Sequence, residues 1–310
     1  MQKSWGLTHR FLIAFLFALS AWSCGSSLQL DEGYVLSQND SIFYKTVGKG
    51  EPLLIIHGGP VLDHQYLLDH FYPLAATNQL IFYDQRASGR SQLSIPPSRM
   101  TFDAMIADIE AIRLHFGYDQ LALLGHSWGG LIAMKYAIKH QDQLNKLILS
   151  NSMAPSTTLW NEENRMLAGR YSATDREQMD KLSSSGLMRS KNAAPYIEQM
   201  MMLSYKVQFY DQEKSNGLSL YITDDYYERS AIFMQLSSEM STYDLMKDLA
   251  TISIPTLLIS GESEPAKDLY MTEFAEAFQH AQVQIIEKAG HLPFIEQPER
   301  YFRVIEAFLN

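Results

Sequence analysis

A pentapeptide at residues 125–129 constrains the fold more than any other feature of the sequence. Gly-His-Ser-Trp-Gly follows an aliphatic run, 121–124, and precedes a helix-like segment, 131–140. A serine between two glycines in this setting is typical of a sharp strand-to-helix turn, because a side chain at either glycine position would crowd the bend. The pattern therefore predicts a turn that raises the Ser127 hydroxyl above a sheet, with the N-terminal dipole of the following helix directed at it.

Short aliphatic runs alternate with helix-like segments along most of the chain. Several runs are continuously apolar, as expected of strands that are buried on both faces of a parallel sheet. Residues 101–116 are typical of the helical segments, because Thr101 is a favourable N-cap and apolar residues recur at helical spacing. We therefore predict an α/β architecture with a mostly parallel central sheet flanked by helices. The predicted strands are 41–47, 53–56, 80–83, 121–124, 147–149, 256–259 and 283–286.

The alternation stops between residues 152 and 250. This interval contains few runs that resemble buried strands and is rich in methionine and tyrosine. We predict that 152–250 is a helical lid inserted into the α/β core, which would consist of residues 41–151 and 251–310. Residues 24–40 are expected to form an N-terminal tether that precedes the core.

The first two dozen residues are typical of an export signal. Lys3 and Arg10 precede an apolar run, 11–22, which is too short to cross about 30 Å of hydrocarbon as a helix. Cys24 follows this run in a context that resembles the processing site of bacterial lipoproteins. We therefore expect residues 1–23 to be removed and Cys24 to carry a lipid that anchors an exported protein to a membrane. A plain cleaved signal and an uncleaved anchor are the alternatives.

Composition argues against several classes of function. The 25 Lys and Arg residues against 35 Asp and Glu give a net charge of −10, so nucleic acid is not an expected partner. Cys24 is the single cysteine, which excludes an intrachain disulfide and a multi-cysteine metal site. Histidine and glutamate lack metal-ligand spacing, and no glycine-rich loop suits a phosphate. We therefore expect neither a metal nor an organic cofactor.

Ser127 needs a base and an acid to act as a nucleophile at neutral pH. In a chain with this turn, the acid and then the histidine follow the serine. His291 comes after the last predicted strand, where α/β sites assemble at the carboxyl edge of the sheet. Two glutamates follow strand 256–259: Glu264 has the usual spacing for the acid, and Glu262 is the alternative. We predict Ser127 as nucleophile, His291 as general base and Glu264 as the acid.

Two backbone N–H groups are expected to stabilise an oxyanion that forms beside the nucleophile. One is the N–H of Trp128, directly after the serine. The other comes from the His-Gly-Gly-Pro segment, where glycine lets the backbone approach a substrate closely; Gly59 is favoured and Gly58 is the alternative. His57 and His126, which flank turns, are expected to orient the backbone and not to react.

These motifs together resemble the α/β-hydrolase superfamily over most of residues 41–310. Within it, the chain is most similar to prolyl aminopeptidases (proline iminopeptidases) and tricorn-interacting aminopeptidases. The resemblance rests on His-Gly-Gly-Pro at 57–60, Asp-Gln-Arg-Ala-Ser-Gly-Arg-Ser at 84–91, Gly-His-Ser-Trp-Gly-Gly at 125–130 and Gly-His-Leu-Pro at 290–293. The chain departs from the family at Val61 and Ala87, where glycine is usual, and at Glu264, where aspartate is usual.

The resemblance implies an α/β-hydrolase fold and a serine aminopeptidase that releases N-terminal proline or a small apolar residue from short peptides. Similar enzymes hold the free α-amine with glutamates on the lid, and a buried ammonium needs a carboxylate partner. Glu239 lies in a stretch that resembles this part of the family and is the candidate for that role. Glu198, Glu213 and Glu228 remain open for a second amine-binding acid. An esterase, lactonase or amidase acting on a substrate without a free amine is the alternative, and a binding protein with an idle triad is a third hypothesis.

Overall fold

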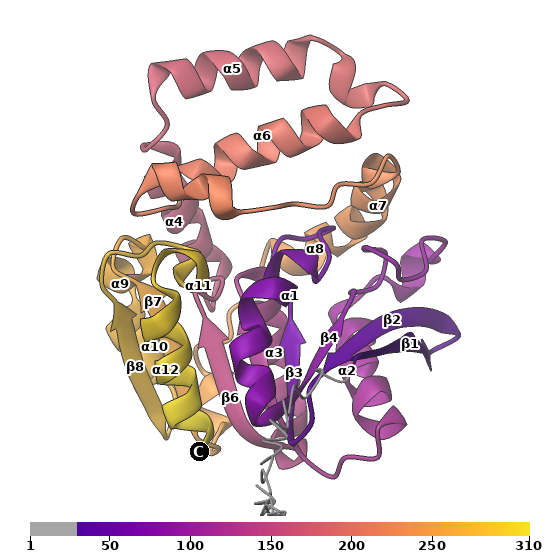
Figure 1. Cartoon of the computed structure of the whole chain (residues 1–310), viewed down its shortest axis with the longest axis vertical. Coiled ribbons are helices and arrows are strands. Elements are labelled where there is room, and N and C mark those ends of the chain that lie inside the picture. Colours follow the sequence, from indigo (N-terminus) through magenta and orange to yellow (C-terminus); the bar gives the residue numbers. More distant parts are fainter. Residues whose placement is uncertain (1–29) are drawn as a thin grey trace, which may run out of the picture.

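A computed structural model describes residues 30–310 (Figure 1). The predicted signal peptide, 1–23, and Cys24 lie outside the described residues. Eight strands form one sheet: β1 Leu30–Ser37, β2 Asp40–Val47, β3 Glu51–Ile56, β4 Asn78–Tyr83, β5 Leu121–His126, β6 Leu144–Ser150, β7 Thr256–Gly261 and β8 Ala281–Ile286. Their order is β1-β2-β4-β3-β5-β6-β7-β8. The pairs β1-β2 and β2-β4 are antiparallel and all other pairs are parallel, which confirms the predicted sheet.

The prediction that residues 24–40 form a tether outside the core is wrong from residue 30 onward. Residues 30–37 are strand β1, which pairs with β2 from Leu30 opposite Val47 to Ser37 opposite Asp40. Acidic residues and a glycine interrupt the apolar pattern of this edge strand, and most of its side chains are exposed. Pairing of its backbone with β2 holds it in the sheet although its side chains give little signal. The α/β core therefore begins at residue 30.

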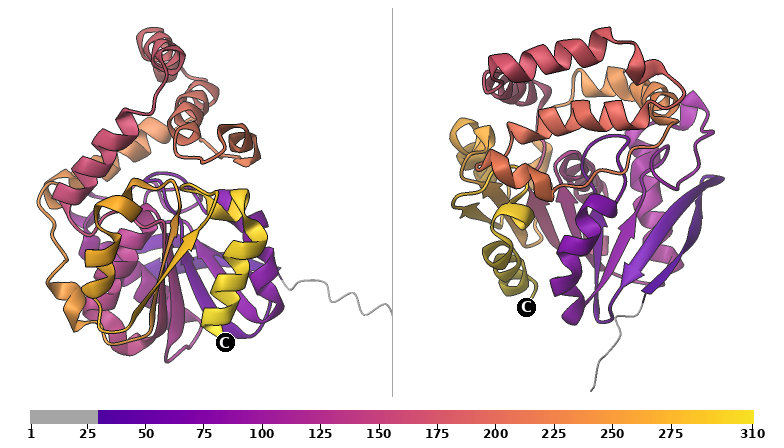
Figure 2. Two further views of the ribbon diagram at one scale, coloured as in Figure 1. Left: turned by 90° about the vertical axis from the view of Figure 1, so that its left-hand side faces the viewer. Right: turned by 45° about the horizontal axis from the view of Figure 1, so that its top comes forward.

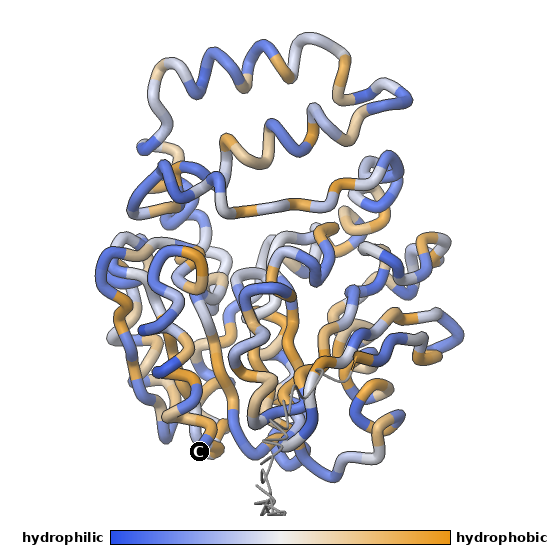
Figure 3. The backbone as a smooth tube through the Cα atoms, in the orientation of Figure 1, coloured by the Kyte–Doolittle hydropathy of each residue, from blue (hydrophilic) through white to orange (hydrophobic). Residues whose placement is uncertain are grey.

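Helices cover both faces of the sheet. One face carries α1 (Gln65–Phe71) and α12 (Pro298–Leu309), and the other carries α2 (Phe102–His115), α3 (Trp128–His140) and α10 (Met271–Glu276). Alternate residues of β3 consequently enter different cores: Leu54 packs in one and Leu53 in the other. The central strands are accordingly apolar along most of their length, as the hydropathy colouring shows (Figure 3).

The local signals for helices agree with the structure at several ends. Thr101 is the N-cap of α2, where its hydroxyl accepts a hydrogen bond from the N–H of Ala104 at 3.1 Å. Helix α12 spans residues 298–309, as its proline-led pattern predicts. The apolar stripe of α2, which includes Ile109, is buried against the sheet.

The chain leaves the core between β6 and β7 and forms the helices of the predicted lid. These are α4 Thr157–Ala168, α5 Ala173–Ser184, α6 Ala194–Lys206, α7 Tyr226–Phe233 and α8 Ser237–Met240. They lie beyond the carboxyl edge of the parallel strands and cover that edge from above (Figures 1 and 2). No helix in residues 30–310 combines the length and the hydropathy needed to cross a membrane.

Candidate active site

Ser127 lies in a sharp turn between β5 and α3. Its backbone dihedral angles are φ 55° and ψ −122°, a conformation that is costly for a residue with a side chain. The flanking glycines make this turn possible: a Cβ at Gly125 would lie 2.4 Å from the carbonyl oxygen of Gly129, and one at Gly129 would lie 2.3 Å from that of Ile56. The turn predicted from the pentapeptide is confirmed.

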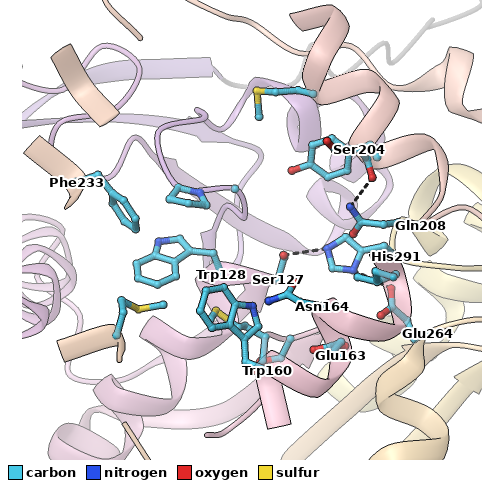
Figure 4. Close-up of a pocket in the computed structure, with 18 of the residues that line it drawn as sticks. Ser127, Trp128, Trp160, Glu163, Asn164, Ser204, Gln208, Phe233, Glu264 and His291 are labelled. Carbon is cyan, nitrogen blue, oxygen red and sulfur yellow. Dashed lines mark hydrogen bonds and ion pairs between the residues drawn. The ribbon is translucent and has the colours of Figure 1, made fainter. Parts of the chain in front are cut away.

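The side chains of Ser127, His291 and Glu264 form a continuous hydrogen-bonded chain (Figure 4). Ser127 Oγ is 2.9 Å from His291 Nε2, and His291 Nδ1 is 2.8 Å from Glu264 Oε1. A carboxylate only accepts, so Nδ1 carries the proton and Nε2 is free to accept one from the serine. The alternative acid, Glu262, is exposed and accepts from the backbone N–H of Lys288 instead.

All four backbone polar groups of residues 290 and 291 are held by other segments. Their partners are the Glu296 carboxylate (2.6 Å from Gly290 N), the Asn151 amide (3.1 Å from Gly290 O), the Gln208 carbonyl (2.9 Å from His291 N) and His126 Nε2 (3.0 Å from His291 O). Gln208 follows α6 in the lid. The lid therefore takes part in placing the imidazole and is more than a cover over it.

The proposed oxyanion donors, Gly59 and Trp128, both line the cavity beside Ser127. Gly58, the alternative, donates its N–H to Tyr66 Oη at 2.6 Å and is thus already engaged. Within residues 30–310, the N–H groups of Gly59 and Trp128 make no hydrogen bond to another protein group. The role of these two N–H groups as oxyanion donors stays a prediction. Their position beside Ser127 agrees with it.

A cavity of about 420 Å³ lies between the core and the lid and reaches Ser127. Its wall is mostly apolar and includes Trp128, Met153, Trp160, Leu167, Met201, Tyr205, Tyr226, Phe233 and Met240. Such a wall suits a compact apolar group held next to the hydroxyl. Across the described residues, no three His, Cys, Asp or Glu side chains are grouped so that they could hold a metal ion.

Glu163, on α4, is a cavity residue that the sequence analysis missed. Its side chain is buried, with the residue 7% exposed, and the Tyr270 hydroxyl lies 3.3 Å from its Oε2. Burial, together with the neighbouring Glu264 carboxylate, raises the pKa of Glu163 to about 8. A signal existed in the sequence: Trp160, Glu163 and Leu167 share one face of a helix, and two of the three are large and apolar.

Glu239 does not line the cavity. It is exposed on α8, whereas the next residue, Met240, faces the cavity. The prediction that Glu239 binds a substrate amine is therefore not supported, because this short helix turns the carboxylate outward. The three glutamates left open for a second amine-binding acid are also absent from the described cavity wall: Glu198, Glu213 and Glu228.

Replacing Glu163 with glutamine is expected to stabilise the fold more at pH 8 than at pH 5. The folded protein keeps the Glu163 proton up to about pH 8, whereas an unfolded chain loses it near 4.5. The stability that this group contributes is therefore complete below pH 4.5 and is lost as the pH rises toward 8. Glutamine has no proton to lose, so the melting temperature at pH 8 should rise by on the order of 5 °C.

Thermal unfolding followed by circular dichroism at the two pH values checks this expectation. Glu239→Gln is the matched control, because it removes a carboxylate from an exposed site on the same lid. A melting-temperature difference for Glu163→Gln that is the same at pH 5 and pH 8 would contradict the raised pKa.

Known proteins resemble this chain over nearly its whole length. The model of the alpha/beta hydrolase fold family matches residues 51–298. A proline iminopeptidase of Clostridioides difficile (strain 630) is 26% identical over 296 residues, which cover 91% of this chain and 99% of that protein. The proline iminopeptidase of Saccharolobus solfataricus is 26% identical over 311 residues, with 92% and 94% covered.

Solved structures show the same architecture at lower sequence identity. The crystal structure of a Mycobacterium smegmatis proline iminopeptidase is similar with a TM-score of 0.66 at 20% identity, covering 90% of this chain and 97% of that one. An esterase from Exiguobacterium antarcticum has a TM-score of 0.63 at 20% identity, covering 89% and 98%. One architecture thus carries proteins named for two different activities.

Proposed function

Because the chain belongs to the alpha/beta hydrolase fold family, we propose that it is a serine hydrolase whose nucleophile is Ser127. The hydrogen-bonded chain from Ser127 through His291 to Glu264 carries this proposal, with contacts of 2.9 and 2.8 Å. The strained backbone of Ser127 supports it further, since such conformations persist where the surrounding structure imposes them.

The reaction follows from the roles of these atoms. Ser127 Oγ attacks the substrate carbonyl carbon while His291 Nε2 takes its proton, and Glu264 stabilises the imidazolium that forms. The N–H groups of Gly59 and Trp128 receive the developing oxyanion. His291 then gives the proton to the leaving group, and a water molecule repeats the sequence on the acyl-enzyme to release the product and regenerate Ser127.

Within this class we propose an aminopeptidase that releases N-terminal proline or a small apolar residue from short peptides. The full-length likeness to proteins named proline iminopeptidases supports it. Glu163 supports it too, because an ammonium entering an apolar cavity needs a carboxylate partner. An adjacent positive charge lowers a carboxyl pKa, so binding of the ammonium favours the ionised form of Glu163.

Three chromogenic substrates separate the aminopeptidase from its alternative, an esterase, lactonase or amidase that needs no free amine. We expect proline p-nitroanilide to exceed its N-acetylated form by more than about 100-fold in kcat/KM, since acetylation removes the charge that pairs with Glu163. Preference for the blocked anilide or for p-nitrophenyl acetate would discard the aminopeptidase and leave the hydrolase. Failure of a fluorophosphonate probe to label Ser127, with Ser127→Ala as control, would discard the hydrolase as well.

We also propose that the enzyme is exported and held at a membrane by a lipid on Cys24. The basic and apolar pattern of residues 1–23 and the sequence after Cys24 support this location. In cells grown with labelled palmitate, the full chain should take up label and the Cys24→Ala variant should not. Undiminished labelling of Cys24→Ala would refute the anchor, and Ser26→Ala controls for the change in the neighbouring sequence.

A further inference from the structure

Tyr66, on α1, lies between the turn that contains the oxyanion donor Gly59 and the segment that contains the general base His291. Its hydroxyl accepts the N–H of Gly58 at 2.6 Å and lies 2.7 Å from His126 Nδ1. The residue is 4% exposed and is not part of the described cavity wall. Its oxygen atom therefore contacts the turn that holds Gly59 but does not reach the substrate.

The hydrogen bonds around His126 have a fixed direction. His126 Nε2 lies 3.0 Å from the carbonyl oxygen of His291, which can only accept, so Nε2 carries the hydrogen. Burial and the neighbouring His291 ring lower the pKa of His126 to about 3, so the ring is neutral at working pH. Nδ1 then has a free lone pair, and the Tyr66 hydroxyl donates to it. One directed chain of hydrogen bonds thus joins Gly58, Tyr66, His126 and the backbone of His291.

The orientation of Gly59 follows from the same contacts. The carbonyl oxygen of Gly58 accepts from His57 Nδ1 at 2.9 Å, and His57 Nε2 accepts the N–H of Gln85 at 3.2 Å. Gly58 is thereby held at its N–H by Tyr66 and at its carbonyl by His57. The described peptides are all trans, so the N–H of Gly59 points opposite to the Gly58 carbonyl and away from His57.

We propose that Tyr66 is a positioning residue for hydrolysis. Its hydroxyl fixes the turn at Gly58 and Gly59, which supplies an oxyanion donor. Through His126, the same hydroxyl also fixes the backbone of His291, and so keeps the general base and the oxyanion donor in their relative positions. The inference rests on the proposed serine hydrolase but is independent of which substrate the enzyme takes. Without the hydroxyl, a buried N–H at Gly58 and a lone pair on His126 both lose their partner. The turn at Gly58 and Gly59 and the His126 ring would then each have one restraint fewer. The N–H of Gly59 and the backbone of His291 could shift as a result.

Tyr66→Phe tests this role by removing one oxygen atom while keeping the ring, which packs 5.8 Å from His126 and 6.4 Å from Phe294 between ring centroids. With p-nitrophenyl acetate, kcat should fall about 10- to 100-fold, less than for complete loss of an oxyanion donor, and KM should stay within about 2-fold. The rate of fluorophosphonate labelling should fall by a similar factor. Both probes need only the triad and the oxyanion donors.

Tyr301→Phe is the matched control. It removes a hydroxyl that is also buried and that donates a hydrogen bond to Ser150 Oγ at 2.9 Å. This hydroxyl makes no hydrogen bond to Gly58 or His126 in the described residues. The substitution should lower the melting temperature about as much as Tyr66→Phe and leave kcat within about 2-fold. His126→Leu breaks the same chain at its next member and should lower kcat as Tyr66→Phe does, so it tests the inference even if Tyr66→Phe folds poorly.

A double-mutant cycle completes the test. Because both changes interrupt one chain, the loss in kcat for Tyr66→Phe with His126→Leu should be clearly smaller than the product of the two single losses. An unchanged kcat in Tyr66→Phe, an equal fall in Tyr301→Phe, or multiplicative losses would each overturn the inference. Wild-type protein that fails to label would overturn the proposed hydrolase itself, which makes the two failures distinguishable.

Discussion

Replacing His291 with alanine is expected to lower kcat/KM by about 10⁴-fold or more while leaving the fold intact. The loss follows because Ser127 Oγ has its proton acceptor in His291 Nε2, 2.9 Å away. The fold should survive because the hydrogen bonds that hold residues 290 and 291 use their backbone atoms and not the imidazole. Hydrolysis of proline p-nitroanilide, together with circular dichroism, measures both parts.

His280→Ala serves as the control for this substitution, since His280 is exposed and has no place in the site. Its activity should remain within about 2-fold of the wild type, as is usual for surface changes. If His291→Ala retained more than about 1% of wild-type activity, another group would have to be the base and the proposed triad would be wrong.

Glu163→Gln is expected to change selectivity more than any other substitution in the cavity wall. Without a carboxylate at this position, the substrate ammonium would be buried without a partner. The kcat/KM for proline p-nitroanilide should therefore fall by about 10²- to 10³-fold. Hydrolysis of p-nitrophenyl acetate, which carries no charge, should stay within about 3-fold. The ratio of the two activities measures the effect without interference from small losses of folded protein.

Glu239→Gln is again the control, and here it also tests the residue that the sequence favoured. It should leave the ratio of the two activities unchanged, because its side chain is exposed outside the cavity. Equal loss on both substrates in Glu163→Gln would indicate a structural role for Glu163. An unaffected ratio would indicate that the amine is bound elsewhere or not at all.

Ser127, His291 and Glu264 could be located from the sequence because each follows a predicted strand. The strands before Ser127 and Glu264 are buried, and the strand before His291 is a largely exposed edge strand. The carboxyl ends of parallel strands meet at one edge of a sheet, so residues far apart in the chain are brought together there by the topology. The central strands were predictable for a related reason: burial on both faces leaves a continuous aliphatic run. Thr101 and the proline of α12 marked helix starts through their local chemistry.

Other parts of the site depend on packing that local patterns encode only in part. Glu163 shares a helix face with Trp160 and Leu167, but the sequence does not show that this face is buried against Tyr270 and the cavity. Glu239 has the residue type that an amine site needs but lies on a helix whose orientation was not predictable. Gln208 contributes a backbone carbonyl, which every residue possesses, so its identity carries no signal.

The contact between Gln208 and His291 has a consequence for attempts to redesign selectivity. The lid looks like an exchangeable module, since it leaves the core after β6 and returns before β7. Yet its segment 207–211 makes two hydrogen bonds to the core. The Gln208 carbonyl accepts from the backbone N–H of His291, and the N–H of Asp211 donates to the Glu296 carboxylate at 2.9 Å. Grafting a foreign cap onto this scaffold would replace part of the support of the general base along with the specificity pocket. Engineering should therefore conserve the path of that short stretch and vary the helices around it.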